Sequence, residues 1–287
     1  MCQDQFRTSD QTFLRIACFM ILSQTYAQEE IHSRWESVYR GHPTLNRFND
    51  RVIDKVLKHL NPPRNALFLD AGCGIGDHSL RIARQGYRCV GIDLSETVLR
   101  TARREAALSG LTSRTSFVCQ ALEELAFRDD TFDAVHCRGV LMHVPQWEKA
   151  LANLCRVLKP GGRIVILEGN HRSLEMAIVL LVRRIQARNS KMLKTAAGFE
   201  FWSEKNGRPF VVRIANIQRL TSELGANRTR VLKIFAHEFW DVNRFPAGAV
   251  RNAVMRCNCV HFLFGLPRFG CIGHAIIAEK QAASKSL

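Results

Sequence analysis

The chain has 287 residues, of which 46% are hydrophobic, and its formal net charge is +15. This length can bury a full core, so we expect one globular domain with a smaller cap. The positive charge favours acidic partners such as phosphates, carboxylates, anionic lipid surfaces or nucleic acid, and a solvated basic surface explains it equally well. The ten cysteines are scattered along the chain, several of them inside apolar runs. This pattern indicates a reducing compartment rather than a disulfide framework, and we expect a cytoplasmic protein.

Residues 1–60 are predicted to be helical and to form a lid. The segment Phe13–Leu22 is apolar apart from Arg15, and Thr25-Tyr26-Ala27 loosely resembles a signal cleavage site. Asp4 and Asp10 precede this short run and Arg15 interrupts it, which favours an amphipathic helix over a secretory signal. No segment has the roughly 18 unbroken apolar residues that a membrane-spanning helix needs.

Between residues 66 and 168, short apolar runs alternate with helical segments. Strands are predicted to begin at Ala66, Arg88, Phe117, Phe132 and Arg163, and helices are predicted at residues 77–86, 95–110 and 147–158. Because the runs are apolar on both faces, we expect a parallel sheet that helices cover on both sides. Right-handed crossovers then predict a doubly wound α/β fold, with ligands beyond the carboxyl ends of the strands.

The alternation of apolar runs with helical segments becomes less clear after residue 168. A helix is predicted at residues 173–194 and another at 246–265, packed over the site, while residues 195–228 give no clear pattern. Residues 231–239 and 273–278 are predicted edge strands that complete a mostly parallel, seven-stranded sheet. We therefore divide the chain into a helical lid at residues 1–60, a ligand-binding core at 61–170, and a cap with the C-terminal edge strands at 171–287.

The strongest motif is Leu69-Asp70-Ala71-Gly72-Cys73-Gly74-Ile75-Gly76, directly after the first strand. Its glycines let the backbone turn sharply and approach a ligand at positions where a Cβ atom would clash. Asp93 ends the next strand about 20 residues later, where a carboxylate can accept hydrogen bonds from both hydroxyls of a ribose. The two features together predict a nucleoside site.

Two nucleotide ligands compete for this site. A dinucleotide site has the spacing G-x-G-x-x-G and directs a helix N-terminus at a pyrophosphate. This loop reads G-x-G-x-G and is preceded by Asp70. A carboxylate suits the ammonium group of S-adenosylmethionine, which carries no phosphate, so the loop favours S-adenosylmethionine over NAD.

Three further sequence motifs add to the glycine-rich one. Together, the four motifs resemble those of the class I S-adenosylmethionine-dependent methyltransferases, especially the small-molecule branch that includes the ubiquinone/menaquinone C-methyltransferases. The three further motifs are Gly91-Ile92-Asp93, Phe132-Asp133-Ala134-Val135 with Leu141-Met142-His143-Val144, and Leu158-Lys159-Pro160-Gly161-Gly162-Arg163. They stand in the family's order within residues 66–168. The resemblance implies a Rossmann-like seven-stranded fold, S-adenosyl-L-methionine as the cofactor, and methyl transfer to an O, N or C nucleophile of a small-molecule or lipid-like acceptor. The cap at residues 171–287 is then an acceptor cap.

The resemblance also implies roles for particular residues. The methionine part of S-adenosylmethionine is expected to be bound by Asp70, Gly72, Cys73 and Gly74, with Cys137 and Arg138 nearby. The ribose is expected to be bound by Asp93, and the adenine by Leu94, Leu122 and Glu123. Relatives commonly have an aspartate where this chain has Ala121. The adenine contact is therefore expected from Glu123 or from backbone groups.

Methyl transfer mainly requires that acceptor and methyl group are held in line, with a base where the nucleophile carries a proton. His136, His143 and His171 lie near the carboxyl ends of the fourth and fifth predicted strands. We take His143 and His171 as candidate catalytic bases. A packing role is the alternative for each.

Residues 172–233 contain thirteen Lys and Arg and four Glu. Met176–Val182 with Arg183-Arg184 resembles an interfacial helix with a basic border, and a buried lid helix with a solvated basic end is the alternative. We expect an acceptor that can be anionic and peripheral contact with anionic membranes. A nucleic-acid partner is not expected, because no RNA-binding module is present. The one-residue spacings of Cys257-x-Cys259-x-His261 suit zinc poorly, so no metal site is expected.

Two other functions stay open at this stage. Ala121 and the lack of an obvious base are compatible with a non-catalytic protein that binds S-adenosylmethionine, such as a scaffold. A nicotinamide-dependent reductase is the other alternative, and the G-x-G-x-G spacing argues against it.

Overall fold

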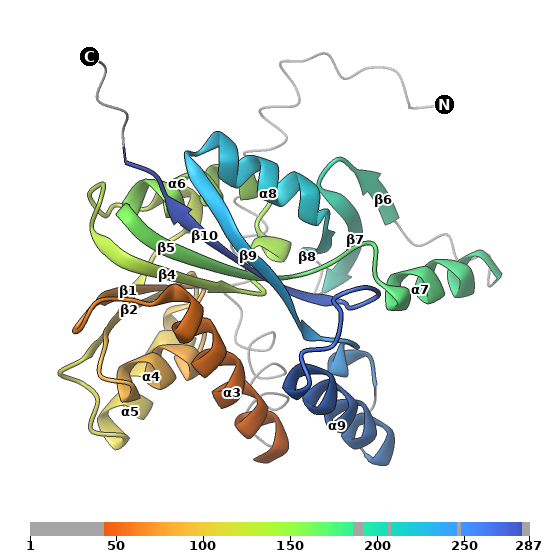
Figure 1. The fold of residues 1–287 in the computed structure, drawn as a ribbon, viewed down its shortest axis with the longest axis horizontal. Coiled ribbons are helices and arrows are strands. Elements are labelled where there is room, and N and C mark those ends of the chain that lie inside the picture. The colour runs from red at the N-terminus through yellow and green to blue at the C-terminus, as the bar shows by residue number, and fades with distance from the viewer. Residues whose placement is uncertain (1–42, 186–191, 206–207, 246–247, 283–287) are drawn as a thin grey trace.

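A seven-stranded sheet forms the centre of the structure, a computed structural model that describes residues 43–185, 192–205, 208–245 and 248–282 (Figure 1). In spatial order its strands are β3 (Thr115–Cys119), β2 (Arg88–Asp93), β1 (Leu67–Ala71), β4 (Phe132–Arg138), β5 (Leu158–Gly169), β10 (Gly273–Lys280) and β9 (Thr229–Glu238). Strand β10 is antiparallel to β5 and β9, and the pairs from β3 to β5 are parallel. The predicted doubly wound, mostly parallel sheet with two C-terminal edge strands is confirmed. Its strand order reverses between β1 and β4, where such sheets bind ligands.

Helices cover both faces of this sheet. In Figure 1, α3 (Pro43–Leu60), α4 (Asp77–Arg84), α5 (Glu96–Leu108) and α9 (Ala249–Leu263) lie on one side, and α6 (Trp147–Val157) and α8 (Ile217–Ala226) lie on the other. In α3 the buried residues Leu45, Phe48, Val52 and Val56 recur at helical spacing and pack with Phe68 of β1. Residues 43–60 therefore cover the sheet, and the role of residues 1–60 as a lid stays a prediction. Residues 1–42 lie outside the described residues.

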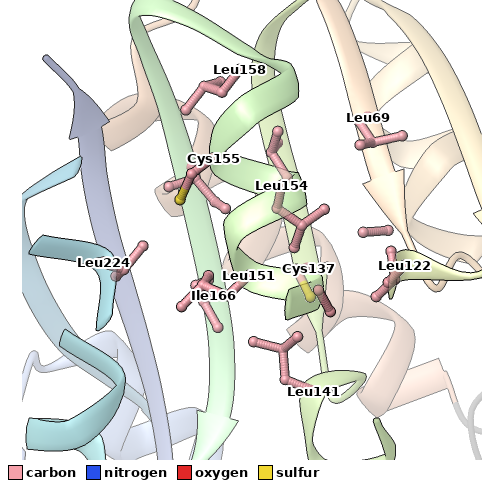
Figure 2. Close-up of a cluster of buried hydrophobic side chains, with 14 of the residues drawn as sticks. Leu69, Leu122, Cys137, Leu141, Leu151, Leu154, Cys155, Leu158, Ile166 and Leu224 are labelled. Carbon is pink, nitrogen blue, oxygen red and sulfur yellow. The ribbon is translucent and has the colours of Figure 1, made fainter. Parts of the chain in front are cut away.

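The core on the α6 side fixes the end of β4. Leu151 and Leu154 of α6 are fully buried and pack with Cys137 of β4, Ile166 of β5 and Leu224 of α8 (Figure 2). Full burial of one such side chain contributes roughly 1.5–3 kcal/mol. The cluster therefore anchors the strand ends from which the loops at the site begin.

A second sheet was not predicted. Strands β6 (Met192–Thr195), β7 (Gly198–Lys205) and β8 (Arg208–Ala215) form an antiparallel three-stranded sheet, and α7 (Leu174–Ile185) packs against it. Met176 of α7 is buried with Phe199 and Ile214 of this sheet and with Ile272. A bridge between Asn170 and Ala215 joins the second sheet to the end of β5. Short 3-10 turns lie at η1 (Leu122–Glu124), η2 (Leu141–His143) and η3 (Val242–Arg244).

None of the described helices has the length and apolar character needed to cross a bilayer.

Candidate functional site

A cavity of about 550 Å³ lies at the carboxyl ends of the central strands. Its wall includes Gly72 after β1, Asp93 of β2, Arg138 of β4, Glu168 of β5 and His237 of β9. A volume of this size suits a small organic ligand. The wall runs from Gln120, directly after β3, to Glu238 of β9, the strands at the two edges of the sheet.

The loop after β1 forms one wall of the cavity. Gly72 and Gly74 have φ values of +69° and +53°, which glycine adopts at little cost. A Cβ atom at Gly72 would overlap the side chain of Val140, which also lines the cavity. The backbone N–H of Cys73 donates to the carbonyl of Ile92 over 2.8 Å. The loop is therefore held against β2 with its backbone at the cavity surface.

Asp93 is held in place by two backbone donors. The N–H of Gly74 lies 2.9 Å from Oδ2, and the N–H of Ser95 lies 3.0 Å from Oδ1. Asp93 lines the cavity, so its carboxylate is placed to accept from the hydroxyls of a ribose there. The structure places Asp93 where the sequence predicted it.

The end of the cavity beside Asp93 fits an adenine. Leu94 and Leu122 give it apolar surface, and Gln120 and Glu123 give it polar atoms. The Oε1 atoms of Gln120 and Glu123 are buried and have no hydrogen-bond partner among the described residues. Burial raises the pKa of Glu123 to about 7. Buried acceptors usually have a donor, and the amino group of adenine can supply one here.

Two residues that were predicted to contact the ligand lie outside the described cavity wall. Asp70 is 2% exposed and is not part of the described cavity wall. The Ser79 hydroxyl donates to its Oδ2 over 2.5 Å, and Nδ1 of His136 lies 2.8 Å from its Oδ1. The carboxylate thus faces α4 and β4 and supports the loop from beneath. Cys137 is fully buried in the core on the α6 side instead of facing the ligand.

Arg138 of β4 also lines the cavity. Its Nη1 lies 3.0 Å from Oδ1 of Asn49 and 3.1 Å from Nε2 of His78. Because arginine can only donate, Nε2 of His78 is the acceptor, and His78 is neutral. Burial, with the nearby charge of Arg138, lowers the pKa of His78 well below its usual range. Arg138 is therefore a fixed cation that can bind the carboxylate of an amino acid.

The two candidate bases differ in position. His143 lines the cavity, and its Nδ1 lies 3.0 Å from the carbonyl oxygen of Val211. His171 is not part of the described wall; its Nδ1 lies 3.1 Å from the carbonyl oxygen of Ala215 and its ring packs on Phe199. His143 stays a candidate. His171 packs on Phe199 outside the described wall, and its role as a base stays a prediction.

The far end of the cavity was missed by sequence reasoning. It contains Glu168, His237 and Glu238, with three side chains of β8, which are Phe210, Val212 and Ile214. Burial raises the pKa of Glu168 and of Glu238 to about 7. The rule that ligands bind beyond strand ends could have identified Glu168 and His237, because both end or nearly end a predicted strand.

This sheet order and cavity define the class I methyltransferase fold. Residues 69–166 match the family model described as a methyltransferase domain. The chain is 34% identical to a ubiquinone biosynthesis O-methyltransferase of Erwinia tasmaniensis, over 53% of this chain and 63% of that one. It is 36% identical to norajmaline N-methyltransferase of Rauvolfia serpentina, over 43% and 44%, and 39% identical to a ubiquinone/menaquinone biosynthesis C-methyltransferase of Bradyrhizobium, over 49% and 60%. The chain thus spans less than two thirds of each relative.

Solved structures agree on the fold. A S-adenosylmethionine-dependent methyltransferase of Methanosarcina mazei aligns with a TM-score of 0.56 at 20% identity, over 80% of this chain and 98% of that one. The cyclase SpnF aligns with a TM-score of 0.55 at 22% identity, over 82% of each chain. The resemblance found in the sequence is confirmed, and the chain carries a methyltransferase domain. Since one neighbour is a cyclase, the fold alone does not define the reaction.

Proposed function

We propose that this protein transfers a methyl group from S-adenosylmethionine to a small or lipid-like acceptor. The observation that carries this proposal is the position of Asp93, held by Gly74 and Ser95 beside the buried, unpaired acceptors of Gln120 and Glu123. These groups match the hydroxyls and the amino group of an adenosine. S-adenosylmethionine, when bound, supplies a methyl group on a sulfonium.

The remaining residues of the cavity have distinct tasks. The backbone of Gly72, Cys73 and Gly74 approaches the methionine part, and Arg138 binds its carboxylate. Leu94 and Leu122 pack on the adenine. The apolar side chains of β8, with Met142, exclude water from the far end. The chain's contribution to the reaction is thus to align the two ligands and keep the site dry.

The far end of the cavity supports an apolar acceptor. Phe210, Val212, Ile214 and Ile272 form much of its wall. Two of the relatives named above act in ubiquinone or menaquinone biosynthesis. Since the relatives include O-, N- and C-methyltransferases, all three kinds of acceptor atom fit the family. His143 is a candidate base for an acceptor that carries a proton.

Calorimetry with S-adenosylhomocysteine tests the donor site. Asp93→Ala is expected to weaken binding about a hundredfold, because two charge-assisted hydrogen bonds contribute roughly 1.5 kcal/mol or more each. Asp93→Asn keeps the shape and one acceptor oxygen and should lose less. Asp129→Ala is the matched control, because Asp129 pairs with Arg156 at the surface. A folded wild-type protein that does not bind, or equal affinity in Asp93→Ala, would contradict the proposal.

A second candidate function is a non-catalytic protein that binds S-adenosylmethionine. Two observations favour it. Ala121 stands where relatives commonly have an aspartate, and a cyclase has the same fold, so the fold also occurs in a protein with another reaction. Incubation with S-adenosylmethionine labelled in its methyl group, together with a lipid or polyphenol extract, separates the two candidates. A labelled product excludes the second one.

We further propose peripheral contact with an anionic membrane. Leu174, Ile178, Leu181 and Ile185 lie on one exposed face of α7. The N–H of Leu174 bonds to the carbonyl of Gly270, so this face adjoins the loop at 264–269. That loop exposes Phe264, Leu266 and Phe269, the last to 91%. Arg172, Arg184 and Arg268 are exposed around these apolar side chains. An apolar surface with a basic border is typical of membrane-surface binding.

Co-sedimentation with vesicles tests this contact. We expect binding to vesicles that contain phosphatidylglycerol and much weaker binding to phosphatidylcholine alone. Phe264→Ser with Phe269→Ser should lower the bound fraction about tenfold, because two large side chains leave the bilayer. Leu108→Ser is the control, since Leu108 is 76% exposed on α5, away from this surface. Binding that is absent, or equal in the double variant, contradicts the contact.

A further inference from the structure

His237 is a buried histidine with unused hydrogen-bonding groups. It lies one residue before the end of β9, is 4% exposed and lines the far end of the cavity. Neither of its ring nitrogens has a hydrogen-bond partner in the part of the chain that the structure describes. Buried polar atoms are nearly always paired in folded proteins. A ligand in the cavity can provide the missing partner.

The neighbouring strand is shaped to hold this ring. Gly273 of β10 pairs with Glu238 and also lines the cavity. A Cβ atom on Gly273 would lie 2.7 Å from Cε1 and 2.9 Å from Nε2 of His237, closer than side chains tolerate. The ring of His237 therefore occupies the space that a side chain at position 273 would fill. Its place at the wall depends on a glycine.

The charges around His237 favour a neutral ring beside an anion. Arg138 of β4, His78 of α4 and His274 of β10 face it, and Oε2 of Glu238 lies 4.0 Å from its Nδ1. Burial, with the charge of Arg138, lowers the pKa of His237 well below its usual range, so one nitrogen keeps a free lone pair. Arg138 repels an ammonium group and attracts an oxyanion. If the ring gains a proton, Glu238 is placed to offset the charge.

We propose that His237 receives the proton of the acceptor, and that the acceptor is an apolar molecule with a phenol-type hydroxyl. This inference rests on the proposed function. The O–H bond breaks and its proton moves to a ring nitrogen of His237. The oxygen uses its electron pair to form the bond to the methyl carbon, and the pair of the broken C–S bond stays on sulfur. His237 acts on the acceptor's hydroxyl, and Glu238 is a positioning residue that stabilises the protonated ring.

The probe for this inference is 4-nitrocatechol, because its anion absorbs visible light at wavelengths where the neutral form does not. It is titrated into the full-length protein saturated with S-adenosylhomocysteine, at a pH at which the free probe is protonated. The wild-type protein is expected to bind it as the anion. His237→Gln should bind it about tenfold more weakly and without the anion band. Glu238→Gln should still bind it but require a higher pH for the band to appear.

Two further variants make the result specific. His261→Gln is the matched control, because His261 is a buried histidine of α9 that is not part of the described cavity wall. It should behave as wild type. Gly273→Ala should reproduce the loss seen in His237→Gln, since its methyl group displaces the ring, although it also presses on Cβ of Glu238. The inference is overturned if the wild type does not bind the probe, binds it as the neutral phenol, or keeps the anion band in His237→Gln. Each of those results can occur while S-adenosylhomocysteine binds and another acceptor is methylated, whereas failure of the proposed function appears as loss of that binding or as the absence of any labelled product.

Discussion

Replacing Arg213 with Met is expected to lower the free energy of unfolding by about 3–5 kcal/mol. Arg213 of β8 is almost completely buried, and its Nε lies 3.0 Å from Oε1 of Glu200 on β7. Its Nη1 donates to the carbonyls of Leu141 and Val144, each over 3.0 Å. Removal of the guanidinium leaves two carbonyls without their donor and leaves the Glu200 carboxylate, which is 13% exposed, without its cation, although Nε1 of Trp202 still donates to its Oε2. The loss also frees the second sheet from the turn that carries Met142.

Urea unfolding of the full-length protein measures this effect. Arg213→Met with Glu200→Leu should recover part of the loss, because no unpaired charge then stays buried. Arg219→Met is the control: Arg219 forms a partly exposed pair with Glu223 on α8 and should cost no more than about 1 kcal/mol. A loss in Arg213→Met as small as that of the control would show that the buried pair does not anchor the second sheet.

Glu168 is expected to make the protein less stable as the pH rises from about 4.5 to 7. Burial raises the pKa of Glu168 to about 7 from the ordinary value of 4.5. Between these values the folded state keeps the proton that the unfolded state has lost. Stability falls with pH wherever the folded state binds more protons. The contribution is complete below pH 4.5, is lost as the pH rises to 7, and amounts to about 3 kcal/mol.

Comparison with Glu168→Gln isolates this contribution. Buried histidines with lowered pKa values, such as His78 and His274, act in the opposite direction, so the wild-type profile alone mixes the two effects. The difference in unfolding free energy between wild type and Glu168→Gln, measured from pH 4.5 to 8, should shift in favour of the variant as the pH rises. Glu124→Gln, at an exposed position, is the control. A constant difference across this range contradicts the assignment.

The sequence predicted those parts of the fold whose signals are local. The glycine loop, Asp93 and the strands between residues 66 and 168 each depend on a short segment, and the structure contains all of them. The contacts of Asp70 could not be predicted, because its partners are distant: Ser79 lies 9 residues away and His136 lies 66. Which face of the loop a carboxylate occupies depends on such partners, and single-sequence patterns do not contain them.

The second sheet was missed although its signal is present. Asn206-Gly207 separates two runs with apolar residues at alternate positions, which is a common hairpin pattern. His237 is a different case, because its position in the cavity depends on β9 lying at the far edge of the sheet, on the other side of β10. That order comes from tertiary packing. The end of β9 could be predicted, but not its neighbours Arg138 and Gly273.

The alternation of β8 has a consequence for how this protein can change. Phe210, Val212 and Ile214 face the cavity, whereas the intervening Arg213 holds the strand to the rest of the molecule. Substitutions of Phe210, Val212 or Ile214 can alter the size and shape of the far end of the cavity without disturbing the contacts of Arg213 or the position of Asp93. Such a strand allows selectivity for a new acceptor to evolve one side chain at a time, while the part of the cavity that is proposed to bind S-adenosylmethionine stays unchanged.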